Sequence, residues 1–198
     1  MIYLLRHGET VWNRANRLQG QLDSPLSRTG IAQIEAIGQF LRDTIEDHSA
    51  YSIVSSPLGR AWQSAVIVAE ALGHEAFRIA IEPRLKEIAY GAYEGLTFAE
   101  VEHAEPGVWE RRRLDEWLFR PPGGENYAEL SARVAPWLHA QSEQTHLIVV
   151  CHGGTSRVIR GLYADLAPEK TVELTLAHGE VYRLTQGRIE TLASQFAP

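Results

Sequence analysis

One short stretch of this chain decides its fold: Ile2-Tyr3-Leu4-Leu5-Arg6-His7-Gly8. The four apolar residues are typical of a buried β-strand, and the glycine marks where that strand ends. Arg6 and His7 are therefore expected at the carboxyl end of a strand, which is where open α/β sheets bind their ligands. A guanidinium suits a phosphate or carboxylate, and an imidazole can act as a nucleophile or carry a proton. A lone pair of this kind is more often a solvated strand end, so its meaning depends on the rest of the chain.

Outward from this strand, the sequence alternates between strand and helix patterns. The predicted strands cover 51–54, 78–81 and 147–151, and the predicted helices cover about 27–45, 57–72, 126–142 and a segment after Gly153-Gly154. Pro57 is expected in the first turn of its helix, and a closing hairpin is expected at about 178–194. This alternation predicts an α/β fold, a three-layer α/β/α sandwich with a mostly parallel central sheet.

Residues 91–125 interrupt this alternation, because they are rich in Trp, Arg and Glu and are closed by Pro121-Pro122-Gly123-Gly124. Such a segment predicts a helical cap over the sheet. We therefore expect residues 1–198 to form a single domain with a cap insertion at about 91–125. Within the cap, the run Arg111-Arg112-Arg113 is expected to be a solvated face that Glu110, Asp115 and Glu116 balance.

The composition limits the classes of partner and compartment. A formal net charge of −6 argues against nucleic acid or an anionic membrane as the main partner. The single cysteine, Cys151, excludes an intramolecular disulfide and fits a reducing compartment. We find no secretory leader and no apolar stretch long enough to span a bilayer. A cytoplasmic location is therefore expected.

Three further side chains follow predicted strands and can join Arg6 and His7. His152 follows strand 147–151 and precedes a glycine-lined helix start, whose free N–H groups suit an anion. Arg60 lies in the first turn of a helix, where a cation opposes the helix dipole unless an anion is near. Glu87 comes a few residues after the third predicted strand. Because a parallel sheet aligns the carboxyl ends of its strands, all five side chains are expected in one pocket.

This set of side chains fits phosphoryl transfer through a phosphohistidine. Arg6 and Arg60 would clamp the equatorial oxygens, and His152 would donate a hydrogen bond to a phosphoryl oxygen. His7 would attack phosphorus in line, and the neighbouring arginines should lower its pKa so that it stays neutral. Glu87 would protonate the leaving alkoxide and then take a proton from water. The mechanism needs neither a metal nor a cofactor, and the histidines lack companions at metal-ligand spacing.

The chain resembles the histidine phosphatase superfamily, also called the phosphoglycerate mutase-like family. The resemblance spans essentially the whole chain, because the family's motifs occur in order. They are Leu5-Arg6-His7-Gly8-Glu9-Thr10, Trp12-Asn13, Gln19-Gly20, Asp23-Ser24-Pro25-Leu26-Ser27, Gly30, Ser55-Ser56-Pro57-Leu58-Gly59-Arg60-Ala61, Leu85-Lys86-Glu87, Gly91, Glu94-Gly95, Pro122-Gly123-Gly124-Glu125 and Val150-Cys151-His152-Gly153-Gly154. The resemblance implies His7 as the phosphorylated nucleophile, Glu87 as the proton donor, and a phosphate pocket of Arg6, Arg60 and His152.

The resemblance also implies weaker candidates around this pocket. Asn13 matches a phosphate-binding position, and the possible substrate-binding residues are Gln19, Gly20, Tyr90 and Gly153. Asn13 can alternatively be a helix or turn cap, and Gln19 a surface loop residue. Substrate specificity is expected in the cap, from residues that include Trp109, Arg112, Trp117, Phe119 and Tyr127.

The segment after Glu87 separates the branches of the family. Its sequence, Ile88-Ala89-Tyr90-Gly91, is similar to the phosphatase branch, whereas cofactor-dependent mutases have a His-Tyr-Gly pattern and a longer insertion there. We therefore expect a metal-independent phosphomonoesterase, monomeric or homodimeric, that acts on small phosphorylated metabolites. The alternatives are a phosphoglycerate mutase-type isomerase, an α-ribazole phosphatase-like or fructose-2,6-bisphosphatase-like enzyme, a phosphoprotein phosphatase, and an inactive binding module.

Overall fold

The computed structural model of the protein describes residues 1–142 and 144–192, which contain one six-stranded sheet. The strands are β1 (Ile2–Arg6), β2 (Ser52–Ser55), β3 (Ala80–Ile81), β4 (Leu147–Cys151), β5 (Val181–Thr185) and β6 (Arg188–Leu192). Their order is β3-β2-β4-β1-β5-β6. The first four strands in this order run parallel, β5 is antiparallel to β1, and β6 is antiparallel to β5. The sheet is thus mostly parallel, as the sequence predicts.

The register of the strands brings several chain segments to the end of the sheet where its parallel strands terminate, which we call the carboxyl edge. Arg6 at the end of β1 pairs with Cys151 at the end of β4, and Ser55 at the end of β2 pairs with Val150. Because β5 runs the other way, its first residue, Val181, lies opposite Leu5. The segments after β1, β2 and β4 and the segment before β5 therefore meet at this edge.

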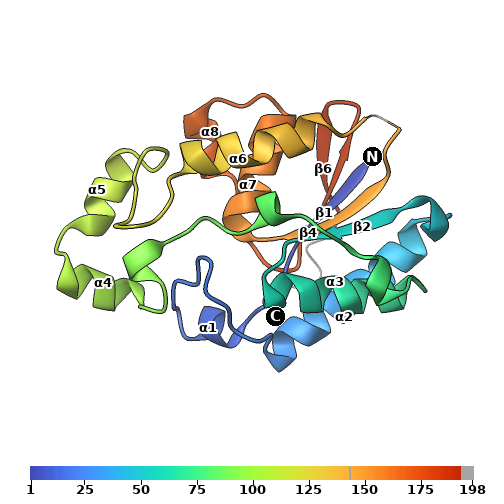
Figure 1. Ribbon diagram of the computed structural model, residues 1–198, viewed down its shortest axis with the longest axis horizontal. Coiled ribbons are helices and arrows are strands. Elements are labelled where there is room, and N and C mark those ends of the chain that lie inside the picture. Colours follow the sequence, from blue (N-terminus) through green and yellow to red (C-terminus); the bar gives the residue numbers. More distant parts are fainter. Residues whose placement is uncertain (143, 193–198) are drawn as a thin grey trace.

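Helices cover both faces of the sheet (Figure 1). One face packs against α2 (Arg28–Thr44) and α3 (Gly59–Ala71). The other packs against α6 (Tyr127–His139) and α7 (Gly153–Tyr163), and the short α8 (Pro168–Glu173) lies against α7. The three-layer α/β/α prediction is confirmed.

The two faces of the sheet have separate apolar cores because strand side chains alternate between them. From β1, Tyr3 and Leu5 join the core with α2 and α3, whereas Ile2 and Leu4 join the core with α6 and α7. A strand buried on both faces reads as an unbroken apolar run, which explains the pattern at 147–151.

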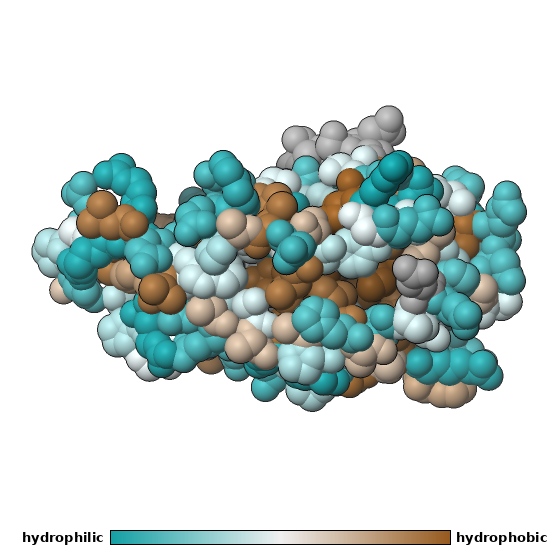
Figure 2. Space-filling view, turned by 90° about the horizontal axis from the view of Figure 1, so that it is seen from above, coloured by the Kyte–Doolittle hydropathy of each residue, from teal (hydrophilic) through white to brown (hydrophobic). Residues whose placement is uncertain are grey.

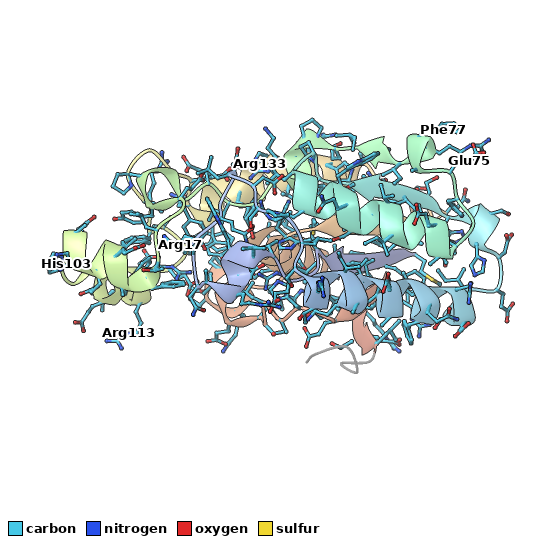
Figure 3. The ribbon with its side chains drawn as sticks, turned by 90° about the horizontal axis from the view of Figure 1, so that it is seen from below. Arg17, Glu75, Phe77, His103, Arg113 and Arg133 are labelled. Carbon is cyan, nitrogen blue, oxygen red and sulfur yellow. The ribbon has the colours of Figure 1, made fainter. Side chains whose placement is uncertain are left out.

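The cap extends from one end of the sandwich (Figure 1). It contains α4 (Phe98–Ala104) and α5 (Val108–Leu114) and encloses a small core of Leu18, Tyr93, Val101 and Val108. Arg17, His103 and Arg113 mark this end of the molecule in Figure 3. The loop after α1 (Val11–Arg14) joins the cap to the sandwich through backbone hydrogen bonds between Leu18 and both Gly95 and Leu96. The four 3₁₀ helices among the described residues are η1 (His48–Ala50), η2 (Ala76–Arg78), η3 (Pro83–Leu85) and η4 (Gly91–Tyr93).

Several predicted boundaries were wrong. The strand predicted at 78–81 contains only Ala80 and Ile81, because a 3₁₀ turn holds the preceding residues at this exposed sheet edge. Pro57 precedes α3 rather than starting it, because the backbone N–H of Ser56 still donates to the Val150 carbonyl and so continues the β2 ladder. The hairpin is formed by β5 and β6, and the predicted positions 193–194 lie outside the described residues.

Other differences concern helices. Sequence reasoning missed α8, although Pro168 at its first position and Glu169 in its first turn are helix-start signals. In the cap, the described structure has no helix between 115 and 126, so the helical prediction for 91–125 is correct only in its first two thirds.

The surface is mixed in polarity. Hydrophilic side chains cover most of the face in Figure 2, with hydrophobic atoms gathered near its middle. No helix in the described part of the chain is both long and apolar enough to cross a membrane.

Candidate active site

His7 lies at the centre of the carboxyl edge and is only 2% exposed. Its backbone N–H continues the ladder by donating to the Cys151 carbonyl. The ring Nδ1 lies 2.7 Å from the carbonyl oxygen of Gly8. Because a carbonyl can only accept, Nδ1 carries the hydrogen and Nε2 keeps its lone pair. The Nε of Arg60 donates to this Nε2 at 3.2 Å. The lone pair of Nε2 therefore faces a cation.

Burial lowers the pKa of His7 well below its ordinary value, and electrostatic interactions with Arg60, His152, Arg6 and His178 lower it further. The direction agrees with the prediction. The largest cause of the lowered pKa is burial, whereas the sequence predicts an effect of the neighbouring arginines alone. His7 is consequently a neutral imidazole near pH 7.

Arg60, the second residue of α3, is 1% exposed and held on several sides. Its guanidinium donates to the carbonyls of Gly20 and Leu22 at 2.7 Å each and to the Asp23 carboxylate at 3.1 Å. Asp23 also accepts hydrogen bonds from the backbone N–H groups of Gly59 and Arg60. The anion needed beside a cation at a helix start is therefore the Asp23 carboxylate, which sequence reasoning did not assign to this place.

Arg6 and His152 flank His7 and leave hydrogen-bonding capacity unused. Arg6 donates from Nη1 to the Leu176 carbonyl, while its buried Nε has no partner within residues 1–142 and 144–192. His152 is the N-cap of α7, and its ring centre lies 5.2 Å from that of His7. Its Nε2 lies 2.7 Å from the Ser56 hydroxyl, and its buried Nδ1 has no partner in the described part of the chain. Each unsatisfied buried polar group costs roughly 1–3 kcal/mol, so the pocket favours a ligand with several acceptor oxygens.

Glu87 lies in the loop after η3 and binds the start of α7. Its carboxylate accepts from the backbone N–H groups of Gly154 at 3.1 Å and Thr155 at 3.2 Å. This corrects the expectation that these N–H groups are free for an external anion, because the protein's own carboxylate occupies them. The arrangement still brings Glu87 into the site, where its charge raises the pKa values of both Arg6 and Arg60 against the larger lowering effect of burial.

Arg133 of α6, labelled in Figure 3, holds the loop that carries Glu87. It donates to the carbonyls of Arg84 at 2.6 Å, Lys86 at 3.2 Å and Glu87 at 3.4 Å. It also forms an ion pair with Glu125 at 2.8 Å. Sequence reasoning missed this residue, because an arginine on an amphipathic helix carries no signal that separates it from a solvated one.

Two predicted residues, Asn13 and Gln19, lie together around Thr10. The Oδ1 of Asn13 accepts from the Thr10 backbone N–H at 3.1 Å, which completes the capping box of α1. The Thr10 hydroxyl lies 3.0 Å from both the Asn13 Oδ1 and the Gln19 Oε1. The side-chain oxygen of Asn13 therefore caps a helix, which is the alternative role predicted for this residue. Contact of either side chain with phosphate or substrate stays a prediction.

The remaining predicted contacts have different surroundings. Gly20 has a φ of +53°, its carbonyl binds Arg60, and a Cβ there would lie 2.1 Å from the Glu94 carboxylate. Gly153 begins α7, and a Cβ there would be 3.4 Å from the guanidinium carbon of Arg6. Burial raises the pKa of Tyr90, whose neighbours include Glu87 and Arg112.

The cap residues proposed for specificity divide into packed and charged ones. Trp109 and Phe119 pack on the cap core, and Trp117 stacks on the buried Tyr127. Arg112 is partly buried and forms an ion pair with Glu116. Its neighbours in the run also form ion pairs, Arg113 with Glu110 as expected and Arg111 with Glu105 instead.

A third imidazole, which sequence reasoning missed, lies next to His7. The ring centre of His178 lies 5.7 Å from that of His7 in an edge-to-face arrangement. A sequence signal exists, because His178 shortly precedes β5, but reading it requires knowing that β5 runs antiparallel to β1. The described residues contain no group of three or more His, Cys, Asp or Glu side chains placed to hold a metal ion.

A mostly parallel sheet with two histidines and two arginines at its carboxyl edge defines the class of protein. The chain belongs to the histidine phosphatase superfamily (branch 1), whose family model matches residues 2–194. It is 32% identical over 197 residues to the Erwinia tasmaniensis protein named "Probable phosphoglycerate mutase GpmB", covering 98% of this chain and 88% of that protein.

Solved structures agree with this assignment. A mycobacterial glucosyl-3-phosphoglycerate phosphatase superposes with a TM-score of 0.79 at 28% identity, over 91% of this chain and 88% of that one. An α-ribazole phosphatase from Shigella flexneri gives a TM-score of 0.79 over 95% of this chain and 92% of that one, and at 22% identity this likeness shows the fold alone. The family, fold class and enzyme class predicted from the sequence are confirmed.

Proposed function

We propose that this enzyme is a metal-independent phosphomonoesterase that hydrolyses small phosphorylated metabolites through a phosphohistidine on His7. One observation carries the proposal: the Gly8 carbonyl fixes the His7 tautomer, so that the Nε2 lone pair faces Arg60. A neutral imidazole with its lone pair directed at a cationic pocket is arranged to attack a phosphoryl group.

In the first step, Nε2 of His7 attacks phosphorus, the N–P bond forms and the ester O–P bond breaks. Glu87 gives its proton to the leaving alkoxide. As the lone pair is used, the Nε–H of Arg60 is released from Nε2 and can donate to a phosphoryl oxygen. The unpartnered Nε of Arg6 and Nδ1 of His152 supply two more donors to the oxygens on which negative charge is spread.

In the second step, water attacks the phosphoryl group and transfers a proton to Glu87. The N–P bond then breaks, inorganic phosphate leaves, and His7 regains its lone pair. Glu87 is thereby protonated again for the next substrate. Splitting one displacement into two lets the same pocket stabilise both transition states.

Hydrolysis of small metabolites is supported by similar structures, one of which is a phosphatase of glucosyl-3-phosphoglycerate. The relative named as a phosphoglycerate mutase favours a second candidate, interconversion of phosphoglycerates. Both functions use the same phosphohistidine. They differ in the fate of the phosphoryl group, which passes to water in one and back to a substrate hydroxyl in the other.

Turnover of a substrate panel in the presence of a chelator tests the proposal. We expect the enzyme to release inorganic phosphate from several esters, including 4-nitrophenyl phosphate and 3-phosphoglycerate, and His7→Ala to abolish the release. His103→Ala, on the exposed surface of α4, is the matched control and should behave as wild type. Hydrolysis that persists in His7→Ala would refute the nucleophile. Primer-dependent interconversion of 2- and 3-phosphoglycerate with little phosphate release would favour the mutase instead.

A further inference from the structure

His178 and His152 belong to segments next to the two strands that flank β1. His152 follows β4, which pairs with one edge of β1, whereas His178 precedes β5, which pairs with the other edge. The ring centres of the two histidines lie 5.2 Å and 5.7 Å from that of His7. His7 is therefore bracketed by two imidazoles across the carboxyl end of its own strand.

The segment that carries His178 is fixed by three arginines. Arg157 donates to the Leu174 carbonyl at 2.9 Å, Arg160 donates to the Thr175 carbonyl, and Arg6 donates to the Leu176 carbonyl, so three successive carbonyls are bound. All three arginines are at least partly buried. The guanidinium of Arg160 also lies 4.1 Å from the ring centre of Tyr182 in β5. A loop held at each successive residue presents His178 in a defined direction, as a binding site requires.

The imidazole of His178 has the chemistry of a hydrogen-bond donor to an anion. Its buried Nε2 has no partner among the described residues. Burial and the charge of Arg6 lower its pKa to about 3, so the ring is neutral near pH 7 and one of its nitrogens carries a hydrogen. Arg6 and His7 interact with this ring, and a phosphoryl oxygen bound beside them would accept its hydrogen.

We propose that His178 binds the phosphoryl group, its Nε2–H donating to an oxygen of the phosphoryl group on His7 from the side opposite to His152. The site then contains one nucleophilic imidazole and two phosphoryl-binding imidazoles. This inference rests on the proposed phosphohistidine chemistry, because it assigns His178 to the group that His7 carries.

Binding of orthovanadate and of inorganic phosphate to His178 variants tests this inference. In His178→Gln, the side-chain amide nitrogen can take the place of Nε2, whereas in His178→Asn it falls near Nδ1, and His178→Leu has no donor. Because a hydrogen bond to a charged group is worth about one to two factors of ten in affinity, we expect His178→Leu to bind orthovanadate about 10- to 100-fold more weakly. His178→Gln should stay within about fivefold of wild type, with His178→Asn between the two.

The controls separate this inference from the proposed function. His103→Leu removes an exposed imidazole of the cap and should bind as wild type. Equal affinity of His178→Leu and wild type would overturn the inference and leave the phosphohistidine intact. Equal weakening in the Gln, Asn and Leu variants would also overturn it, because a packing role does not depend on where the donor lies.

If wild type itself binds no orthovanadate and forms no phosphoenzyme, the proposed function fails instead. If His178→Leu does not fold, the order of Gln above Asn decides.

Discussion

The carboxyl edge of the sheet and the cap both carry arginines, but they hold them in different ways. At the sheet edge, Arg60 is buried and donates to backbone carbonyls, to Asp23 and to His7. In the cap, Arg113 is 78% exposed and pairs with a glutamate that is also exposed. Removing a buried cation leaves several acceptors unpaired, whereas an exposed ion pair contributes about 0–1 kcal/mol. This difference predicts that activity tolerates little change at the sheet edge, while the cap can vary.

After the complete loss expected of His7→Ala, the largest predicted effect belongs to Glu87 at the sheet edge. Glu87→Gln keeps most of the hydrogen bonds to α7 but removes the proton, so kcat for an alkyl phosphate should fall about 10²- to 10⁴-fold. The rate of phosphoenzyme formation from 4-nitrophenyl phosphate should fall much less, because 4-nitrophenolate leaves without protonation. Rapid-quench kinetics with both esters measure the difference. An equal loss of phosphoenzyme formation for both esters would contradict proton donation by Glu87.

The three imidazoles of the sheet edge should make stability depend on pH. His7 and His152 have pKa values well below the ordinary value, and that of His178 is about 3. From about pH 6.5 downward, the unfolded chain binds protons that the folded protein excludes, so the free energy of unfolding should fall.

Each such histidine adds a slope of up to about 1.4 kcal/mol per pH unit within this window. Denaturant titrations between pH 7 and 5 in phosphate-free buffer measure the total slope. His178→Leu should have a shallower slope than wild type. Stability that stays constant as the pH falls to 5 would contradict neutral burial of these rings.

A smaller effect is expected from Arg133, which acts through the loop of Glu87. Arg133→Met retains the length of the side chain and removes its three hydrogen bonds to that loop, so kcat should fall about tenfold while KM changes little. Arg120→Met is the matched control, since Arg120 is half exposed and pairs with Glu129 of α6, the helix that carries Arg133. Steady-state kinetics of both variants test this. Loss of affinity without loss of kcat would argue against positioning of Glu87.

The smallest effect is expected in the cap. Arg113→Ala should leave kcat/KM within about twofold of wild type and stability within about 0.5 kcal/mol, because both members of its ion pair are exposed. The same measurements on Arg112→Ala show whether the partly buried member of the run differs. A large loss of activity in Arg113→Ala would remove the distinction between cap and sheet edge.

How far the sequence predicts the site depends on which segment carries each residue. Arg6, His7 and His152 follow apolar strands directly, so strand ends locate them without knowledge of the loops. Arg60 is located by the first turn of the predicted helix that comes after β2. Asp23 and Arg133 act through long-range contacts with backbone groups, which leave no local pattern.

His178 illustrates a different limit of sequence reasoning. Its place at the site follows from the antiparallel direction of β5, and the pattern of a hairpin does not say which strand it joins or in which direction. The division into a single domain with a cap at 91–125 likewise stays a prediction, as do the oligomeric state and the identity of the substrate. These depend on surfaces rather than on strand ends.

Direct detection of the phosphoenzyme tests the central claim most closely. Enzyme mixed with a phosphate ester and quenched within milliseconds should carry one acid-labile, base-stable phosphoryl group. Peptide mass spectrometry under alkaline conditions should place it on His7, and it should accumulate in Glu87→Gln and be absent from His7→Asn. Turnover with no phosphorylated enzyme, or with the phosphoryl group on another residue, would contradict the account.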